Sequence, residues 1–236
     1  MIILLAAAVL PAVFLLSRVN KMDTIEKEPW SILRKLLIFG ALSGIPAALV
    51  ESLLTGVLLG ALTEGTVLYN LVAGFIVAAL VEESFKFFFL YKFTFKSPDF
   101  NYRFDGVVYA VFVSMGFAIL ENVLYVFQGG LGVAVSRALL ALPLHAACGV
   151  YMGIAYGQQK VQSLYKPATF GSVAAACLPV PILIHGFYDF CAFMQTELFV
   201  IIFIVFVIAV FILTLRQLKK ASGEDRPVNE VTIDAQ

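Results

Sequence analysis

The chain is short of charged residues. Of its 236 residues, 14% are charged and 61% are hydrophobic, whereas a soluble domain has roughly 25% charged and 45–50% apolar residues. This composition excludes a soluble globular protein and predicts a polytopic membrane protein. Sixteen basic and sixteen acidic residues give a net charge of zero. Nucleic acid is therefore excluded as a partner, because its recognition needs a basic face.

Cysteine and tryptophan are also scarce. The three cysteines, Cys148, Cys177 and Cys191, all fall in apolar segments. Their odd number and their spacing fit neither a disulfide framework nor a zinc ribbon, so we expect them to be buried as small hydrophobic residues. One tryptophan beside 22 phenylalanines predicts aromatic rings spread over helix surfaces, without a tryptophan belt at the membrane interface.

Long apolar runs dominate the sequence. A membrane-spanning helix needs about 20 mostly apolar residues, and the sequence has seven such candidates. They are Ile2–Ser17, Leu36–Leu62, Val67–Tyr91, Gly106–Phe127, Val133–Gly157, Ala168–Phe193 and Leu198–Leu215. We therefore expect an all-α, polytopic transmembrane helical bundle with about seven spans. No basic residue precedes the first run, which favours an uncleaved anchor over a signal peptide.

The basic residues predict the orientation. Fourteen of the sixteen lysines and arginines follow the first, third, fifth and seventh runs, and the exceptions are Lys86 and Arg137. The positive-inside rule places the N-terminus outside and the C-terminus in the cytoplasm. We expect Arg137 to extend to the membrane interface. Residues 1–218 then form one integral-membrane domain, and residues 219–236 form a polar cytoplasmic tail that we expect to be disordered.

Eight ionisable residues lie inside the apolar runs. They are Glu51, Glu82, Glu83, Lys86, Glu121, His145, His185 and Asp189. A charge at the bilayer centre costs at least ~2.5–3.5 kcal/mol, so such residues usually face a protein interior or a wet cavity and mark a functional site. Both histidines of the chain belong to this set. For Glu51, which matches no motif, we expect a structural or bundle-facing role rather than a catalytic one.

Helical spacing brings several of these residues together. Lys86 lies three residues after Glu83 and four after Glu82, so it can neutralise one glutamate and leave the other as a general base for water. His185 and Asp189 are four residues apart. Asp189 can therefore orient one ring nitrogen and leave the other for a substrate or a metal.

Prolines near the histidines predict kinks. Pro179 and Pro181 precede His185, and Pro143 precedes His145. A proline inside a span frees a backbone carbonyl, which is tolerated at membrane depth where it lines a hydrated cavity. We therefore expect a wet pocket near both histidines.

Three motifs follow one another in separate apolar runs. Glu82 to Lys86 reads E-E-x-x-K, Phe117 to Glu121 reads F-x-x-x-E, and His185 to Asp189 reads H-x-x-x-D. In this order they resemble the PrsW family of intramembrane proteases, which is distantly similar to the CAAX prenyl proteases and the Abi proteins. Those relatives have E-E-x-x-x-R and F-x-x-x-H instead, so the lysine and the third glutamate favour PrsW.

The resemblance implies hydrolysis of a peptide bond in or next to the transmembrane segment of a substrate. By the resemblance, Glu82 and Glu83 activate water, and Glu121, His185 and Asp189 are their partners. Lys86, Asn122 and His145 are additional candidates. We expect a multi-pass protein of a bacterial plasma membrane, acting on a single-span, anti-sigma-factor-like protein in regulated proteolysis.

The sequence leaves both the cofactor and the class of function open. Zinc is a possible cofactor, held by Glu83, Glu121, His145 and His185, although the sequence has no H-E-x-x-H motif. A metal-free mechanism, with histidine and Asn122 stabilising the oxyanion, fits the sequence equally well. Intramembrane acids and histidines also serve proton relays, so a proton- or ion-coupled transporter is the main alternative function. The second alternative function is a non-catalytic membrane scaffold that binds a partner helix.

Overall fold

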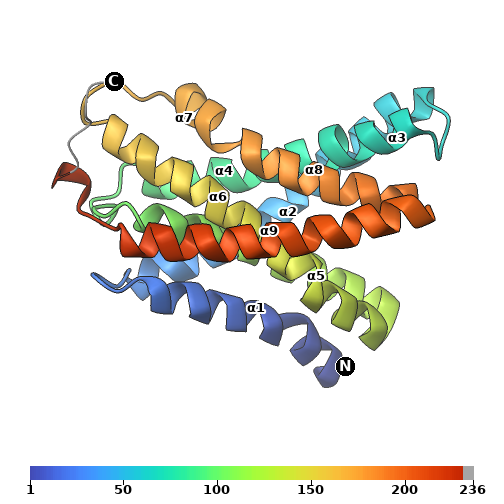
Figure 1. The fold of residues 1–236 in the computed structure, drawn as a ribbon, viewed down its shortest axis with the longest axis horizontal. Coiled ribbons are helices and arrows are strands. Elements are labelled where there is room, and N and C mark those ends of the chain that lie inside the picture. Colours follow the sequence, from blue (N-terminus) through green and yellow to red (C-terminus); the bar gives the residue numbers. More distant parts are fainter. Residues whose placement is uncertain (231–236) are drawn as a thin grey trace.

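The computed structural model describes residues 1–230, and these residues are almost entirely helical (Figure 1). The helices are α1 (Ile2–Met22), α2 (Trp30–Leu58), α3 (Val67–Leu71), α4 (Leu80–Thr94), α5 (Asp105–Leu139), α6 (Ala141–Gln162), α7 (Phe170–Cys177), α8 (Pro179–Met194) and α9 (Glu197–Gly223). Short 3-10 turns span Leu59–Ala61 and Val228–Glu230, and a π-helix spans Val72–Ala79. Between residues 1 and 230 there is no β-strand.

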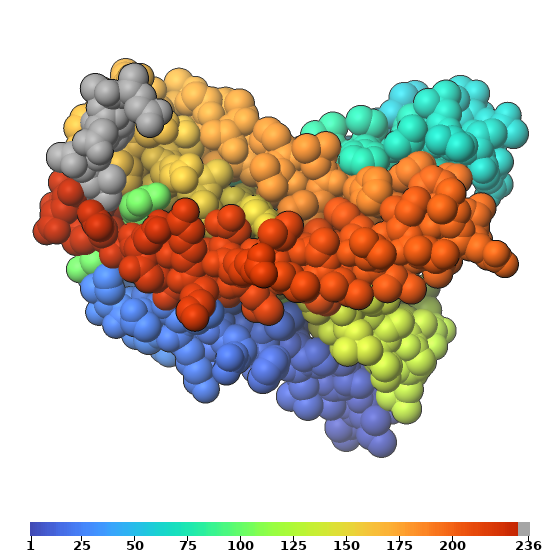
Figure 2. Space-filling view, viewed as in Figure 1, coloured from blue at the N-terminus to red at the C-terminus, as the bar shows by residue number. Residues whose placement is uncertain are grey.

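These elements form an all-helical membrane protein. Four stretches are long and apolar enough to cross a membrane, and α7 with α8, bent by 46°, makes a fifth. The four are Ile2–Met22, Trp30–Ala61, Asp105–Gln162 and Glu197–Gly223. Figure 2 shows α9 lying across one whole face of the molecule, and its large apolar side chains, such as Ile201 and Val205, are exposed as lipid contact requires. The all-α membrane bundle is confirmed, and seven crossings stay a prediction.

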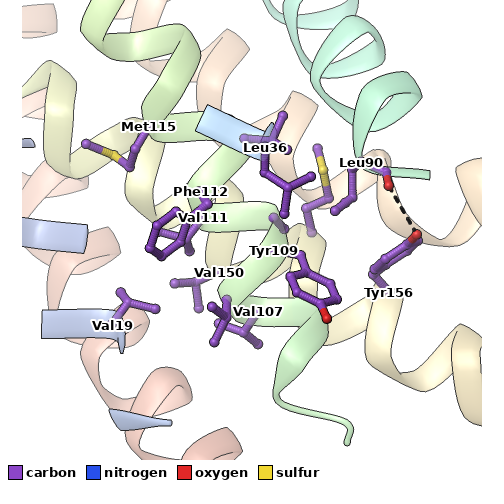
Figure 3. Close-up of a cluster of buried hydrophobic side chains, with 14 of the residues drawn as sticks. Val19, Leu36, Leu90, Val107, Tyr109, Val111, Phe112, Met115, Val150 and Tyr156 are labelled. Carbon is purple, nitrogen blue, oxygen red and sulfur yellow. Dashed lines mark hydrogen bonds between the residues drawn. The ribbon is translucent and has the colours of Figure 1, made fainter. Parts of the chain in front are cut away.

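Helix α5 forms the centre of the bundle. Every residue from Asp105 to Ala118 is buried, and Figure 3 shows Tyr109, Phe112 and Met115 in the core. Small residues let α6 approach α5 closely, because a Cβ added at Gly153 would lie 2.4 Å from the Cα of Val107. This packing fixes the first half of α5, from which the helix continues to Glu121.

Three irregular places shape the half of the bundle that contains the two histidines. The π-helix precedes α4 and packs tightly on α8, since a Cβ at Gly74 would lie 2.9 Å from the carbonyl oxygen of Gly186. Pro179 begins α8 after the 46° bend, as its sequence position predicts. Gly130 interrupts α5 with φ of 74°, a left-handed conformation that favours glycine. Pro143 lies in the first turn of α6, where a missing backbone N–H breaks no helical hydrogen bond.

The C-terminal segment is ordered up to residue 230, where the sequence predicted disorder. Helix α9 continues to Gly223, and the chain then returns to the loop before α5. Asp225 Oδ1 accepts from the backbone N–H of Phe104 at 2.8 Å, and the N–H of Val228 donates to the carbonyl of Asn101 at 2.7 Å. Val228 is buried, which explains the order. The rest of the predicted tail, 231–236, lies outside the described residues.

A buried acidic group joins the loop between α1 and α2 to the start of α5. The Tyr109 hydroxyl donates to the Glu28 carboxylate, and Asp105 lies beside that carboxyl and accepts from the N–H groups of Asn101 and Tyr102. Burial raises the pKa of Glu28 above its usual value, and it raises the pKa of Asp23 in the same loop to about 6. At this end of the bundle, the folded state therefore favours protonated carboxyls.

Replacing Glu28 with glutamine should stabilise the protein at pH 8 and not at pH 5. A carboxyl whose pKa is higher in the folded state contributes stability at low pH, which is lost as the pH rises above its ordinary value of ~4.5 and through the raised pKa. The neutral amide of glutamine removes that loss and still accepts from Tyr109. Thermal unfolding of Glu28→Gln and wild type, followed by circular dichroism at both pH values, measures the effect. A difference in Tm that is independent of pH would contradict this expectation.

Candidate active site

A cavity of about 630 Å³ lies between α2, the π-helix, the middle of α5, the start of α6 and the second half of α8. Six of the eight ionisable residues identified inside the apolar runs line it. They are Glu51, Glu82, Glu121, His145, His185 and Asp189. The other two, Glu83 and Lys86, are fully buried behind its wall. Residues from α4, α5, α6 and α8 thus meet at one place, as the sequence predicted.

Lys86 connects both glutamates of the first motif. Its Nζ donates to Glu82 Oε2 at 3.0 Å and to Glu83 Oε1 at 2.8 Å. The sequence predicted that the lysine would neutralise one glutamate only. Because Glu82 lines the cavity and Glu83 does not, Glu82 is the member of the pair that a water molecule in the cavity can reach.

The two histidines extend this network on opposite sides. His145 Nδ1 lies 3.2 Å from Lys86 Nζ, and its Nε2 lies 3.0 Å from Glu121 Oε2. An ammonium group can only donate, so Nδ1 accepts and the Nε2–H donates to Glu121. One proton on Nε2 satisfies both contacts, and His145 is therefore oriented as a neutral ring.

His185 has acidic neighbours at both ring nitrogens. Its Nδ1 lies 2.9 Å from Glu83 Oε1, and its Nε2 lies 3.4 Å from Asp189 Oδ2 and 3.9 Å from Glu82 Oε2. Two donors facing three carboxylates suit a doubly protonated, positively charged imidazole. The spacing of His185 and Asp189 correctly predicted their contact, whereas the contact with Glu83 depends on the packing of α4 against α8.

Arg137 lies in this network, although the sequence predicted that it would extend to the membrane interface. Its Nη2 donates to Glu121 Oε2 at 2.8 Å and its Nε donates to Asn122 Oδ1 at 2.9 Å. The break at Gly130 folds residues 131–139 back over the outer part of α5, which brings Arg137 to residues fifteen and sixteen positions earlier. The two glycines before it, Gly129 and Gly130, were the available sequence signal.

Asn122 faces away from the cavity. Its amide donates to the carbonyl of Ala8 in α1 at 2.7 Å, its oxygen accepts from Arg137, and the residue is fully buried. Both ends of the amide are therefore engaged. Asn122 is therefore buried away from the place where an oxyanion would form, and its role is to join α1 to α5.

Comparison with known proteins now decides the family. Residues 28–215 match a family described as PrsW family intramembrane metalloprotease. The chain belongs to the PrsW family. The protease PrsW of Geobacillus kaustophilus is 34% identical over 95% of this chain and 94% of its own length. Those of Halalkalibacterium halodurans and Bacillus subtilis are each 30% identical, over 94% and 80% of this chain and 99% and 83% of their own lengths.

PrsW membership settles the broad function. The protein is an intramembrane peptidase and a multi-pass protein of the cell membrane, and its named relatives are bacterial. No solved structure matches the chain. The geometry of its site therefore has to be interpreted from its own residues.

The family's description as metalloproteases raises the question of which residues suit an ion. Glu82, Glu83, His145 and His185 each offer a ligand atom, and these atoms lie within 4.8 Å of one another. Two imidazole nitrogens and two carboxylate oxygens are donors that zinc accepts. The sequence had proposed Glu121 in place of Glu82. In the structure Glu121 is instead held by Arg137 and His145.

Lys86 shares the same donors. Its Nζ lies within 3.2 Å of Glu82, Glu83 and His145, three of the four candidate ligands. One acceptor in the group is unused, because Glu83 Oε2 is buried and has no hydrogen-bond partner among the described residues. The donor types fit zinc, but an ion at this set requires Lys86 to move away.

Replacing Arg137 with methionine should lower kcat roughly 10- to 100-fold, because a hydrogen bond to a charged group contributes ~1.5–3 kcal/mol and Glu121, which holds His145 against Lys86, would lose its guanidinium partner. Arg137→Lys should recover part of this loss of kcat. Lysine restores the positive charge, but it lacks the planar guanidinium that bonds Glu121 and Asn122 at the same time. Initial cleavage rates of a membrane reporter, with KM and kcat separated, measure this. If both variants instead have an equally raised KM and an unchanged kcat, Arg137 does not act through Glu121.

Proposed function

We propose that this protease cleaves a single-span membrane protein at a peptide bond in or next to the transmembrane segment, using water activated by Glu82. The observation that carries the proposal is the cavity at which carboxylates and imidazoles from four helices meet. A peptide bond needs an activated nucleophile, a proton donor and an acceptor for developing charge. Glu82, His185 and their partners supply these groups.

In the proposed reaction, Glu82 takes a proton from a water molecule in the cavity while the water oxygen attacks the carbonyl carbon of the substrate. The new C–O bond pushes an electron pair onto the carbonyl oxygen. The Nε2–H of His185, whose contacts with Asp189 and Glu82 are long at 3.4 and 3.9 Å, donates a hydrogen bond to that oxygen. The carbonyl then re-forms, the C–N bond breaks, and Glu82 returns the proton to the leaving amine.

Glu83, Lys86 and Asp189 position these two groups in the proposal. Glu83 is fully buried and contacts both Lys86 and His185. Lys86 in turn fixes Glu82, and Asp189 lies 3.4 Å from His185 Nε2. Should zinc be bound, Glu82, Glu83, His145 and His185 would hold it, and it would supply Lewis-acid polarisation of the water or the carbonyl.

The proposed topology has seven crossings, with the N-terminus outside. The helical stretches run alternately in opposite directions along the long axis of the bundle (Figure 1). The cavity extends along α2 from Gly44 to Leu59 near the end of that helix, which is the outer end in this orientation. A substrate would therefore be cut near the outer membrane surface, as expected for an anti-sigma-factor-like protein with one span.

The test is direct cleavage. Purified protein is reconstituted in liposomes with a panel of tagged single-span reporters whose outer juxtamembrane sequences differ. We expect new fragments from some reporters, with one terminus mapped by mass spectrometry to the membrane region. Intact reporters throughout, with a protein that remains folded by circular dichroism, would refute the proposal. Proton uptake by the liposomes without fragments would point to the transporter instead.

A further inference from the structure

Glu51 is a carboxylate of the cavity that the proposed reaction does not use. It lies on α2 among cavity-lining residues spaced along one helix face, Gly44, Ala48, Thr55 and Leu59. The opposite face of α2 is turned outward, since Leu53 and Val57 are 69% and 71% exposed. Glu51 therefore faces the cavity inside the bundle, which agrees with the bundle-facing position that the sequence predicted.

Four carboxylates line this cavity, and three of them have cationic or imidazole partners. Glu82 pairs with Lys86, Glu121 with Arg137 and Asp189 with His185. Among the described residues Glu51 has no such partner, and its Oε1 is buried without a hydrogen bond. Glu82 and Glu121 are near enough to repel its charge. The two cationic groups that attract it, Lys86 and His185, are already paired with other carboxylates. Glu51 is thus the cavity carboxylate with an unmet requirement for a cation or a strong donor.

The position of Glu51 separates it from the reacting groups. Ala47 packs with Val81 and Phe117 beside the glutamate pair, and Glu51 follows one helical turn later, about 6 Å along the axis. Arg137, the one arginine of the cavity lining, is already held by Glu121 and Asn122. No cation of the cavity wall is therefore free to neutralise Glu51 among residues 1–230.

We propose that Glu51 forms a specificity subsite that receives a lysine or arginine side chain of the substrate, a few residues from the cleaved bond. This inference rests on the proposed protease function of the same cavity. A carboxylate held in a partly dry site and repelled by two neighbours gains most from a cationic ligand. Substrates with an acidic residue at the same position add a further like charge and are rejected.

The test uses one single-span reporter in which lysine, glutamine or glutamate is placed in turn at each position around the mapped cleavage site. Wild type should prefer lysine at one position roughly tenfold over glutamine in kcat/KM, since 1.4 kcal/mol corresponds to tenfold. Glu51→Gln should abolish this preference, and Glu51→Lys should reverse it toward glutamate. Glu64→Gln, in the exposed loop after α2, is the matched control and should retain the wild-type preference.

Each outcome separates the subsite from the protease function. Failure of wild type to cleave any reporter refutes the proposed function. Cleavage by wild type with the same charge preference in Glu51→Gln and Glu51→Lys refutes the subsite alone. An equal loss on all three reporters in Glu51→Gln, with unchanged Tm, also refutes it and assigns Glu51 to the reaction itself.

Discussion

Glu82→Gln should lower kcat about 10²- to 10⁴-fold, the usual contribution of a positioned general base, and should leave KM within a few-fold of wild type. The amide keeps the size of the side chain and its place beside Lys86, but it takes no proton from water. The protein should remain folded, because Lys86 keeps its 2.8 Å contact with Glu83. Single-turnover cleavage of the reporter, with substrate binding measured separately, checks this expectation.

The neighbouring glutamate supplies the control for that result. Glu83 is fully buried and touches both Lys86 and His185, so Glu83→Gln should reduce both activity and Tm. Glu82→Gln should reduce activity alone. If Glu82→Gln still cleaves the reporter and Glu83→Gln does not, Glu83 and not Glu82 activates the water. Full activity in both variants would mean that the glutamate pair does not activate water.

Lys86→Met should destabilise the protein by about 3–5 kcal/mol, because it leaves buried carboxylates without their cation. The side chain of Lys86 is 1% exposed and contacts Glu82 and Glu83, so water cannot replace the ammonium. The same change should increase affinity for zinc, because Lys86 no longer competes for three of the four candidate ligands. Chemical denaturation in detergent measures the first effect, and zinc content after dialysis at a fixed free zinc concentration measures the second.

Lys92→Met is the matched control, since Lys92 lies on the same helix and is exposed. It should change neither stability nor zinc content. Equal zinc affinity in wild type and Lys86→Met would contradict the competition between Lys86 and zinc. Stability of Lys86→Met equal to that of Lys92→Met would contradict the role of Lys86 as the cation of the buried carboxylates.

Much of the site could be predicted from local spacing. Glu82 with Lys86 and His185 with Asp189 lie one helical turn apart, so helix geometry alone brings each pair into contact. The all-helical membrane bundle followed from the apolar runs in the same way. The contact between the two pairs was not local, because it depends on the side-by-side packing of α4 and α8.

Other features depend on turns and packing that apolar patterns do not reveal. Arg137 reaches Glu121 because Gly130 reverses the local path of the chain. The segment after α9 is ordered through a single buried residue, Val228, and backbone hydrogen bonds to a distant loop. Glu51 belongs to no motif, and it faces the cavity because of the way α2 packs against α5, which the apolar pattern of α2 does not specify.

The π-helix before α4 lets one continuous helical segment pack against α8 and also present its polar residues to the cavity. Its i→i+5 hydrogen bonds turn the chain less per residue than an α-helix does, which changes the phase between the residues before and after it. Gly74 can therefore meet the backbone of α8 closely, while Glu82, two turns later, faces the cavity and Lys86, three turns later, contacts His145. A regular α-helix along the same path could keep the contact of Gly74 with α8 or the direction of Glu82 and Lys86, but not both.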